Sequence, residues 1–392
     1  MRMFAFSLPV PGADLLSMAT IVSIAPYRFL PPLNGGHWGI VNVEKLLSVY
    51  NQAHTVTTVD NTFRQEDYPF SIHPILDNSK LRYLPYGQYG KVSGLAKALK
   101  PQYLFCHHHY MFPMVAKLAR RLNIPAYIRC HNIESERFRS TGKWWWKAMW
   151  WFERHAFRRS DGVFFVTRED RDWAIKRYGL PESKALIMPF GINLQSRPLS
   201  TTAGKSGLAG ELGLDPSVPW LFFMGKLDYV PNEEAVIFIV RSILPLLRQR
   251  LGHFHILICG KGLSEALQQE IAAAGDDIRH LGFVPEIEPL IVACDLMINP
   301  VVSGGGVKTK VVESLAWNKT VVSAHSGAIG IEKEVCGNKL LTAPDKDWQA
   351  FTAQVVAALA QGAEQIPDAF FTYYYLGNIA QRLQQYFGDR GR

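Results

Sequence analysis

The hydrophobic pattern alternates between short apolar runs and longer segments in which apolar residues recur at helical spacing. Short apolar runs bounded by turn residues are typical of strands that are buried on both faces. The expected strands are residues 20–26, 56–59, 103–106, 126–130, 160–166, 185–188, 220–224, 255–259, 278–283, 296–302 and 320–323. The expected helices are residues 40–50, 92–99, 114–121, 167–178, 235–247 and 288–293. Strands that alternate with helices predict an α/β fold with parallel sheets.

The length of 392 residues is sufficient for two domains of ordinary size. A stretch rich in Pro, Ser, Thr, Gly and Lys at residues 196–219 is typical of a linker. We therefore expect an N-terminal domain at residues 1–195 and a second domain that begins at residue 220. Apolar residues make up 48% of the chain, as in soluble globular proteins, and no apolar run approaches the roughly 18 residues that a membrane-spanning helix needs.

The beginning of the chain and its cysteines indicate a cytoplasmic protein. Pro9, Pro11, Gly12 and Asp14 interrupt the only apolar patch near the start, which makes it a poor secretory signal, and Met18 is an alternative initiator. The five cysteines are scattered without a CxxC pair and have strand-like neighbours. Such cysteines are typical of buried, reduced thiols in the cytosol.

Charge is distributed unevenly along the chain. The first 200 residues contain 26 basic and 14 acidic residues, whereas the remainder contains 16 basic and 20 acidic ones. This asymmetry predicts that the basic N-terminal half alone contacts an anionic surface of a partner.

Residues 143–159, KWWWKAMWWFERHAFRR, contain five of the ten tryptophans. Tryptophan flanked by Lys and Arg suits an interfacial helix on anionic lipid, although a core helix is the alternative. Three consecutive tryptophans cover too wide an arc for one buried stripe. On the membrane interpretation, Trp144, Trp145, Lys147 and Trp150 would contact the bilayer, and the protein would be peripheral at the inner face of the membrane.

A strand, a glycine turn and a helix follow one another in residues 296–317. The apolar run at the start is followed by Gly304, Gly305 and Gly306, and helical spacing begins at Val307. This arrangement aims unpaired backbone N–H groups at an anion, and glycines let a ligand approach the backbone.

Lys308 and Lys310 add positive charge in the expected first helical turn, where the macrodipole disfavours cations. A phosphate is a natural compensating partner for these two amines. Glu313 lies one to two turns further on and can face the same side. An ordinary strand-to-helix crossover is the alternative, because a lone glycine loop is weak evidence.

At this point the chain resembles a known family. GGGVKTKVVESLAWNKTVVS, followed by SGAIGI at residues 326–331, resembles the donor-site signature of GT-B glycosyltransferases of the GT4 type, glycosyl transferases group 1. The resemblance implies a GT-B fold, in which two Rossmann-like domains face a central cleft, and a nucleotide-diphosphate sugar at this helix N-terminus. Glu313 matches the second Glu of the family's paired motif, which usually holds the ribose hydroxyls. The first Glu would fall at Gly305, and because a subset of the family has glycine at this position, we interpret the change as a variant of the motif rather than a loss.

The resemblance extends into the N-terminal half. Gly35 and Gly36, candidate donor-binding residues, match a glycine pair that follows the first strand and faces the inter-domain cleft in relatives, although a plain turn is the alternative. The family's R-x-H-N-x-E segment begins here at Arg129 and places His131 close to the donor sugar and acceptor. The resemblance thus implies His131 and Glu313 as catalytic residues.

The acceptor side is expected at neighbouring strand ends. His107 and His108 end one expected strand, at the edge where α/β proteins place ligands. Adjacent histidines have poor spacing for a metal site. Asn132 and Glu134 follow His131, and the alternative for them is a helix start capped by Asn132 with Glu134 in the first turn.

In the second half, GKLDYVPN resembles the family's phosphate-binding segment after its first strand. Lys226 takes the place of the family's Arg, and Asn232 replaces a Lys that is common in relatives. Gly260 and Val284 match further donor-site positions, the latter through backbone contacts to the base. The resemblance implies a donor-binding domain at residues 220–365 and a terminal helix at residues 366–392 that crosses back to the first domain.

The sequence therefore predicts a glycosyltransferase that moves a sugar from a nucleotide-diphosphate sugar to a glycan or lipid-linked acceptor, with retention as in the family. No metal, cofactor or nucleic-acid partner is implied, since lysines and a helix N-terminus would neutralise the leaving diphosphate. One alternative is a nucleotide-sugar epimerase or nicotinamide oxidoreductase, although no GxGxxG follows the first strand. The other is a sugar-nucleotide-binding relative that has lost catalysis, which the glycine at position 305 motivates.

Overall fold

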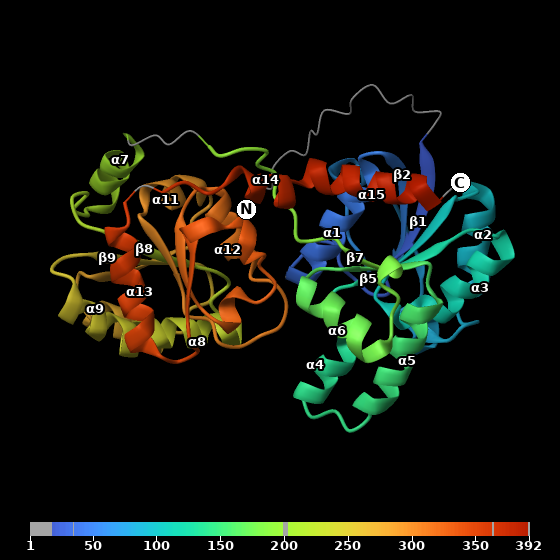
Figure 1. Cartoon of the computed structure of the whole chain (residues 1–392), viewed down its shortest axis with the longest axis horizontal. Coiled ribbons are helices and arrows are strands. Elements are labelled where there is room, and N and C mark those ends of the chain that lie inside the picture. Colours follow the sequence, from blue (N-terminus) through green and yellow to red (C-terminus); the bar gives the residue numbers. More distant parts are fainter. Residues whose placement is uncertain (1–17, 34, 199–202, 363, 391–392) are drawn as a thin grey trace. The chain divides into compact units, whose positions relative to one another are not determined.

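The computed structural model describes residues 18–33, 35–198, 203–362 and 364–390. These residues form two compact units (Figure 1): an N-terminal unit of residues 18–191 with 376–390, and a C-terminal unit of Ile192–Tyr375. The start of the chain, for which a poor secretory signal was considered, lies outside the described residues. Within the described ranges, no helix is both long and apolar enough to cross a membrane.

The N-terminal unit is built on a sheet of seven parallel strands. They are β1 (Ala19–Ile24), β2 (Asn51–Thr58), β3 (Ser71–Leu76), β4 (Tyr103–His107), β5 (Ala126–Cys130), β6 (Gly162–Phe165) and β7 (Ala185–Ile187). Their order across the sheet is β3-β2-β1-β4-β5-β6-β7. All register pairs are parallel, so every strand has its carboxyl end at the same edge.

Helices cover both faces of this sheet (Figure 1). Helices α1 (Gly35–Ser48) and α15 (Leu376–Arg390) share one apolar cluster with it. The other face packs against α2 (Tyr89–Leu99), α3 (Phe112–Leu122), α5 (Trp146–Arg159) and α6 (Arg168–Tyr178). The short α4 (Glu134–Ser140) pairs with α5, and their connecting turn extends away from the sheet in Figure 1.

The C-terminal unit repeats this plan with six parallel strands. They are β8 (Trp220–Met224), β9 (His255–Cys259), β10 (Ile278–Gly282), β11 (Leu296–Asn299), β12 (Thr320–Ala324) and β13 (Leu340–Ala343). Their order is β10-β9-β8-β11-β12-β13. One face packs against α8 (Val230–Phe238), a π-helical turn (Ile239–Ile243), α9 (Leu244–Arg250), α10 (Glu265–Ala273) and α13 (Trp348–Ala360). The other packs against α7 (Ala203–Leu212), α11 (Glu288–Ala293), α12 (Thr309–Ala316) and α14 (Asp368–Tyr374).

The structure confirms the α/β fold with two Rossmann-like sheets. The expected strands at 126–130, 220–224 and 255–259 coincide with β5, β8 and β9. The sequence pattern did not predict β3, β13, α7, α10 or α13. Pro74 obscured β3, because proline cannot donate a ladder hydrogen bond and is tolerated here on an edge strand.

The stretch expected to be a plain linker contains α7, so that prediction was wrong in its middle part. The helix is rich in glycine, and tertiary contacts stabilise it. Ala209 is buried in the core of the C-terminal unit, and Lys205 forms an ion pair of 2.6 Å with Asp295.

Two helix starts also differ from the expectation. α1 begins at Gly35 rather than at residue 40, so the glycine pair forms its first residues instead of a preceding loop. α12 begins at Thr309, with Lys308 at the N-cap, rather than at Val307. Gly304 and Gly306 have φ angles of 80° and 74°, which delays the helix.

Candidate functional site

Both sheets have a point at which the strand order reverses, between β1 and β4 in one unit and between β8 and β11 in the other. In open α/β sheets, ligands bind outside the carboxyl ends of the strands at such a point. The glycine loop follows β11, and Lys226 follows β8. His107 is the last residue of β4, and His131 directly follows β5, the neighbour of β4. Each unit therefore has its candidate residues where the topology favours a ligand.

The glycine loop of the C-terminal unit is held against the start of α8. A Cβ atom on Gly304 would lie 2.8 Å from Cγ of Pro231, so only glycine permits this approach. The hydroxyl of Ser303 donates a hydrogen bond of 2.6 Å to Glu234 and makes a second link to α8. The loop is thus set in place before any ligand binds.

Lys310 is the cation at the centre of this arrangement. Its Nζ donates a hydrogen bond of 2.9 Å to Oδ1 of Asn232 and lies 3.8 Å from the ring centroid of Phe223. Nδ2 of Asn232 in turn donates to the carbonyl of Lys226 at 2.9 Å. Burial, and then the charge of Lys308, hold the pKa of Lys310 well below its usual 10.5. Across the described residues, no carboxylate pairs with this amine, so an anion would supply its missing counter-charge.

The other two lysines are already engaged with the protein. Nζ of Lys308 donates to the carbonyls of Gly304 and Gly306, at 2.6 and 3.2 Å, and burial lowers its pKa to about 8. Lys226 is exposed and forms an ion pair of 3.2 Å with Asp228. A phosphate that binds these lysines must compete with their present partners, which are loop carbonyls at Lys308, Asp228 at Lys226 and the amide oxygen of Asn232 at Lys310.

The remaining donor-site positions have different roles. A Cβ atom on Gly260 would lie 1.8 Å from the carbonyl oxygen of Gly225, so this glycine lets two loops pack closely. Val284 has its side chain partly buried against the core of the C-terminal unit. Glu313 is exposed on α12, and no described residue makes a hydrogen bond or ion pair with its carboxylate. Of these residues, Glu313 is the one whose side chain is free to contact a ligand.

In the N-terminal unit, three of the predicted histidines lie together. Nε2 of His131 is 3.3 Å from Nδ1 of His107, and the ring of His131 stacks on that of His108 with centroids 4.5 Å apart. Burial, and then the charges of His108, Arg129 and His107, hold the pKa of His131 well below 6.5. His131 is therefore a neutral imidazole, able to accept or donate a hydrogen bond.

His108 adopts a strained backbone with φ 63° and ψ 158°. This region is nearly closed to residues with a Cβ, and such strain occurs most often at functional sites. The turn directs the three adjacent histidines differently: Nε2 of His108 is 2.8 Å from the hydroxyl of Tyr27, whereas His109 lies 3.4 Å from the carboxylate of Glu153. His109 is consequently separated from the other two.

The start of α4 corrects one expectation. Asn132 does not cap this helix; the N-cap residue is Ile133, without a side-chain bond. Instead, the carboxylate of Glu153 on α5 accepts hydrogen bonds of 3.0 Å from the backbone N–H groups of Glu134 and Ser135. Glu134 does lie in the first turn, as expected, where it is buried. A long-range contact from α5 thus replaces the predicted local cap.

Glu134 is held by two neighbours, Tyr110 and Arg137, both of which donate hydrogen bonds to its carboxylate. A side chain engaged in this way can shape an acceptor site, but it is less available for chemistry.

The amino end of α1 lies beside the histidines. Gly35 and Gly36 are exposed first residues of this 14-residue helix. One turn later, a Cβ atom on Gly39 would lie 3.4 Å from Nδ1 of His131. Unpaired N–H groups of the first turn are thus near His131 and can bind an anion.

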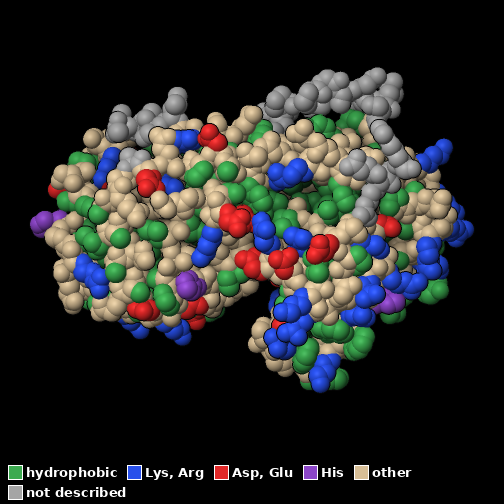
Figure 2. All heavy atoms as spheres, in the orientation of Figure 1, with side chains coloured by type: hydrophobic (Ala, Val, Ile, Leu, Met, Phe, Trp, Pro, Cys, Tyr) green, Lys and Arg blue, Asp and Glu red, His purple; other side chains and the backbone are tan. Residues whose placement is uncertain are grey.

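The α4–α5 hairpin exposes aromatic and basic side chains, visible as green and blue spheres on its projecting end in Figure 2. Trp144, Trp151 and Trp145 are 89%, 63% and 37% exposed. Lys147, also predicted to contact a membrane, is exposed. Trp150 is the exception: it is half-buried, packs on the N-terminal core and meets Tyr178 edge-on at 5.2 Å, so its predicted exposure was wrong.

Sequence reasoning missed Glu44 and Trp151. Glu44 is fully buried on α1, and its carboxylate contacts His107 at 2.5 Å. The available signal was an acidic residue among apolar neighbours on the inner face of a helix. For Trp151, the signal was the helical phase, which places it on the opposite side from Met149 and Glu153.

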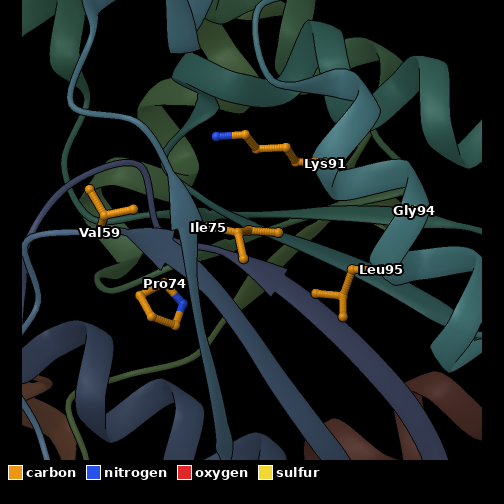
Figure 3. A pocket seen from close by; sticks show the side chains of 6 residues that line it. All are labelled: Val59, Pro74, Ile75, Lys91, Gly94 and Leu95. Atoms are coloured by element: carbon orange, nitrogen blue, oxygen red, sulfur yellow. The ribbon is translucent and has the colours of Figure 1, made fainter.

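A separate apolar hollow lies between β3 and α2. It is lined by Val59, Pro74, Ile75, Lys91, Gly94 and Leu95 (Figure 3). Lys91 already forms an ion pair of 2.7 Å with Asp77. None of the residues predicted for catalysis or donor binding lines it.

Comparison with known proteins places these features in a family. Residues 218–361 match the model "Glycosyl transferases group 1", and residues 50–196 match "Glycosyltransferase Family 4". A curated relative, an uncharacterized 44.6 kDa protein in the cps region of Klebsiella pneumoniae, is 21% identical over 273 residues. The match covers 64% of this chain, and the chain spans 65% of that relative's length.

Solved structures share the fold over nearly the whole chain. A glycosyltransferase from Rickettsia africae superposes with a TM-score of 0.72 and 14% identity, covering 95% of this chain and 98% of that one. HepE from Anabaena, in complex with UDP, gives a TM-score of 0.72 and 16% identity, covering 94% and 100%. Identities this low establish the fold, and the two family models together match about three quarters of the sequence. The chain therefore belongs to the GT-B glycosyltransferases of group 1 and family 4.

Proposed function

We propose that this protein transfers a sugar from a nucleotide-diphosphate sugar to a glycan or lipid-linked acceptor. The observation that carries the proposal is Lys310, a half-buried amine at the start of α12 without a carboxylate partner among the described residues. It lies at the strand-order reversal of a Rossmann-like sheet, beside a glycine loop. A diphosphate fits this position because it neutralises the amine and accepts from free N–H groups.

The relatives support a nucleotide donor. HepE from Anabaena has been crystallised with UDP and, separately, with UDP-glucose. In this chain, the exposed carboxylate of Glu313 on the same helix would accept hydrogen bonds from ribose hydroxyls. The lysines and the helix N-terminus would stabilise charge on the leaving diphosphate, without a resident metal or cofactor.

The reacting groups are supplied by the histidine cluster. His131 is neutral and follows a strand at the ligand edge of its sheet, so its imidazole can hydrogen-bond a hydroxyl of the donor sugar or acceptor. As in the family, we propose that the anomeric configuration is retained. No pair of carboxylates is needed for such a transfer, in contrast to glycoside hydrolysis.

The proposal is tested by incubating the purified protein with a panel of UDP- and GDP-sugars, with and without candidate acceptors, and measuring nucleotide release. We expect release from one donor, accelerated by an acceptor, and a product of retained configuration. Binding without release would identify a sugar-nucleotide-binding relative that lacks catalysis, consistent with Gly305. Epimerised donor, or a change in nicotinamide absorbance, would identify one of the other enzyme classes.

The α4–α5 hairpin supports a membrane-associated acceptor. Its exposed basic side chains (Arg137, Arg139, Lys143 and Lys147) accompany the exposed Trp144 and Trp151. The three acidic residues of the hairpin are engaged: Glu153 is buried inside the unit, Glu134 pairs with Arg137, and Glu136 pairs with Arg139. An anionic lipid surface matches this chemistry, since each basic residue near it contributes about 1 kcal/mol and indole rings bury at the interface.

Replacing Trp144 and Trp151 together with Ser is expected to abolish the salt-resistant part of binding to anionic vesicles. Electrostatic attraction is screened over about 8 Å at physiological ionic strength, so the part that survives salt comes from buried indole. Co-sedimentation with phosphatidylglycerol vesicles at low and high salt measures both parts.

Two variants serve as controls for this experiment. Tyr86→Ser removes an exposed aromatic residue elsewhere on the same unit and should bind like the parent. Trp150→Ser should lower the melting temperature instead, because Trp150 packs on Tyr178. A folded parent that stays in the supernatant at low salt would mean that the acceptor is soluble.

A further inference from the structure

A buried carboxylate lies behind the histidine cluster. Glu44 is 0% exposed on the inner face of α1, where its neighbours Ile40, Val41 and Leu47 are apolar. Its Oε1 is 2.5 Å from Nε2 of His107, and its Oε2 accepts a hydrogen bond of 2.5 Å from the hydroxyl of Thr55. An apolar residue of similar volume would often stabilise a fold as well as a buried charged group does. The position of Glu44 therefore points to a role beyond packing.

The hydrogen-bond partners assign the tautomers along the chain of histidines. An ionised carboxylate only accepts, so a neutral His107 beside it carries its proton on Nε2, and its Nδ1 then bears a lone pair. This lone pair faces Nε2 of His131 at 3.3 Å, which must supply the proton of that contact. A neutral His131 with its proton on Nε2 has a lone pair on Nδ1.

Nδ1 of His131 faces α1: a Cβ atom on Gly39 would lie 3.4 Å from this nitrogen. Throughout the described ranges, no residue donates a hydrogen bond to this nitrogen. The free acceptor thus lies next to the exposed amino end of α1.

We propose that Glu44 is a positioning residue: acting through His107, it holds His131 in the tautomer that presents an acceptor nitrogen to a substrate hydroxyl. The inference rests on the proposed function and adds to it the residue that sets the state of His131. A lone pair on Nδ1 suits a hydroxyl donor, whereas the other tautomer would present an N–H to it.

Glu44→Gln is the variant that reverses this state with little change in shape. Thr55 continues to donate to the amide oxygen, so the amide NH₂ faces His107 and donates to its Nε2. The proton of His107 then moves to Nδ1, and His131 becomes protonated on Nδ1 as well. We expect a loss in kcat of about 10²-fold, the scale of general acid–base contributions, with an unchanged KM for the donor.

Nitrogen-15 NMR of the histidine rings reads the tautomer directly and needs no turnover. We expect His131 to be protonated on Nε2 in the parent and on Nδ1 in Glu44→Gln. Glu153→Gln is the matched control: this carboxylate is equally buried in the same unit but contacts His109 instead of His107. It should change the melting temperature without changing the His131 signals.

The outcomes separate this inference from the proposed function. If His131 of the parent is protonated on Nδ1, the assignment is overturned even if Glu44→Gln does not fold. If an active parent and Glu44→Gln share the same kcat, Glu44 is structural only. A parent that transfers no sugar overturns the proposed function, and this inference with it.

Discussion

Replacing His131 with Ala is expected to lower kcat for sugar transfer by about 10²-fold or more, the range of positioned acid–base groups, with little change in donor affinity. His131 lies at the carboxyl end of β5 in contact with His107 and His108, and these contacts position its ring. The phosphate-binding features lie on other elements, chiefly Lys310, so the loss should fall on the chemical step. Steady-state kinetics combined with calorimetric binding of the nucleotide measures the two quantities separately.

His253→Ala is the matched control, since His253 is exposed in the C-terminal unit and none of the interactions described involves it. The pH profile gives a second check. Because burial holds the pKa of His131 well below 6.5, the ring stays neutral from about pH 8 to pH 6.5 and should cause no fall in kcat over that range. A kcat for His131→Ala equal to that of the parent would reduce His131 to a packing residue.

The candidate donor site could be proposed from the sequence because the signals that suggest it are local. Gly304 and Gly306 have positive φ angles, and Lys308 and Lys310 follow within four residues. A glycine turn between a buried strand and a helix leaves few geometries, so the residues that bind an anion can be named in advance. What the sequence could not show is which partner holds each amine. Lys308 folds back onto loop carbonyls, whereas Lys310 is held by Asn232, 78 positions earlier.

The histidine cluster was predictable only in part, because some of its contacts join residues that are far apart in the sequence. His107 and His131 could be placed at strand ends, but Glu44 is 63 positions from His107, and no local pattern connects the two. A single acidic residue on an apolar helix face is also compatible with a solvent-exposed turn. Only the sheet order, with β1 and β4 adjacent and α1 packed over them, brings these residues together.

Two predictions for the α4–α5 hairpin, the Asn132 cap and the exposure of Trp150, were wrong because tertiary contacts decided them. Asn132 was a reasonable local cap, yet Glu153 replaced it from the next helix, because a buried carboxylate satisfied two N–H groups at once. Trp150 and Trp151 are adjacent in sequence but differ by about 100° in helical phase. That difference directs Trp150 toward Tyr178 and leaves Trp151 exposed.

Lys310→Met is expected to weaken nucleotide-diphosphate binding by roughly 10- to 100-fold, since a charge-assisted hydrogen bond contributes about 1.5–3 kcal/mol and each 1.4 kcal/mol is tenfold. Methionine keeps an unbranched apolar stem only one atom shorter than that of lysine, so the loss reports chiefly the missing amine rather than a cavity. Asn232→Asp should also weaken binding, but for a different reason. A carboxylate would then replace the amide oxygen that lies 2.9 Å from Nζ of Lys310 and would neutralise this amine before a diphosphate binds.

Calorimetric titration with UDP and GDP at low and high salt measures both effects, and Lys333→Ala, an exposed lysine on the same unit, is the control. Because Lys310 is half-buried without a counter-charge among the described residues, removing its amine should also leave the melting temperature of the ligand-free protein unchanged or higher. Stabilisation by added UDP should fall in step with affinity, since a ligand that binds only the folded state raises stability by mass action. If Lys310→Met binds UDP and GDP as tightly as the parent does, the diphosphate lies elsewhere in the protein, and the amine beside the glycine loop serves the fold alone.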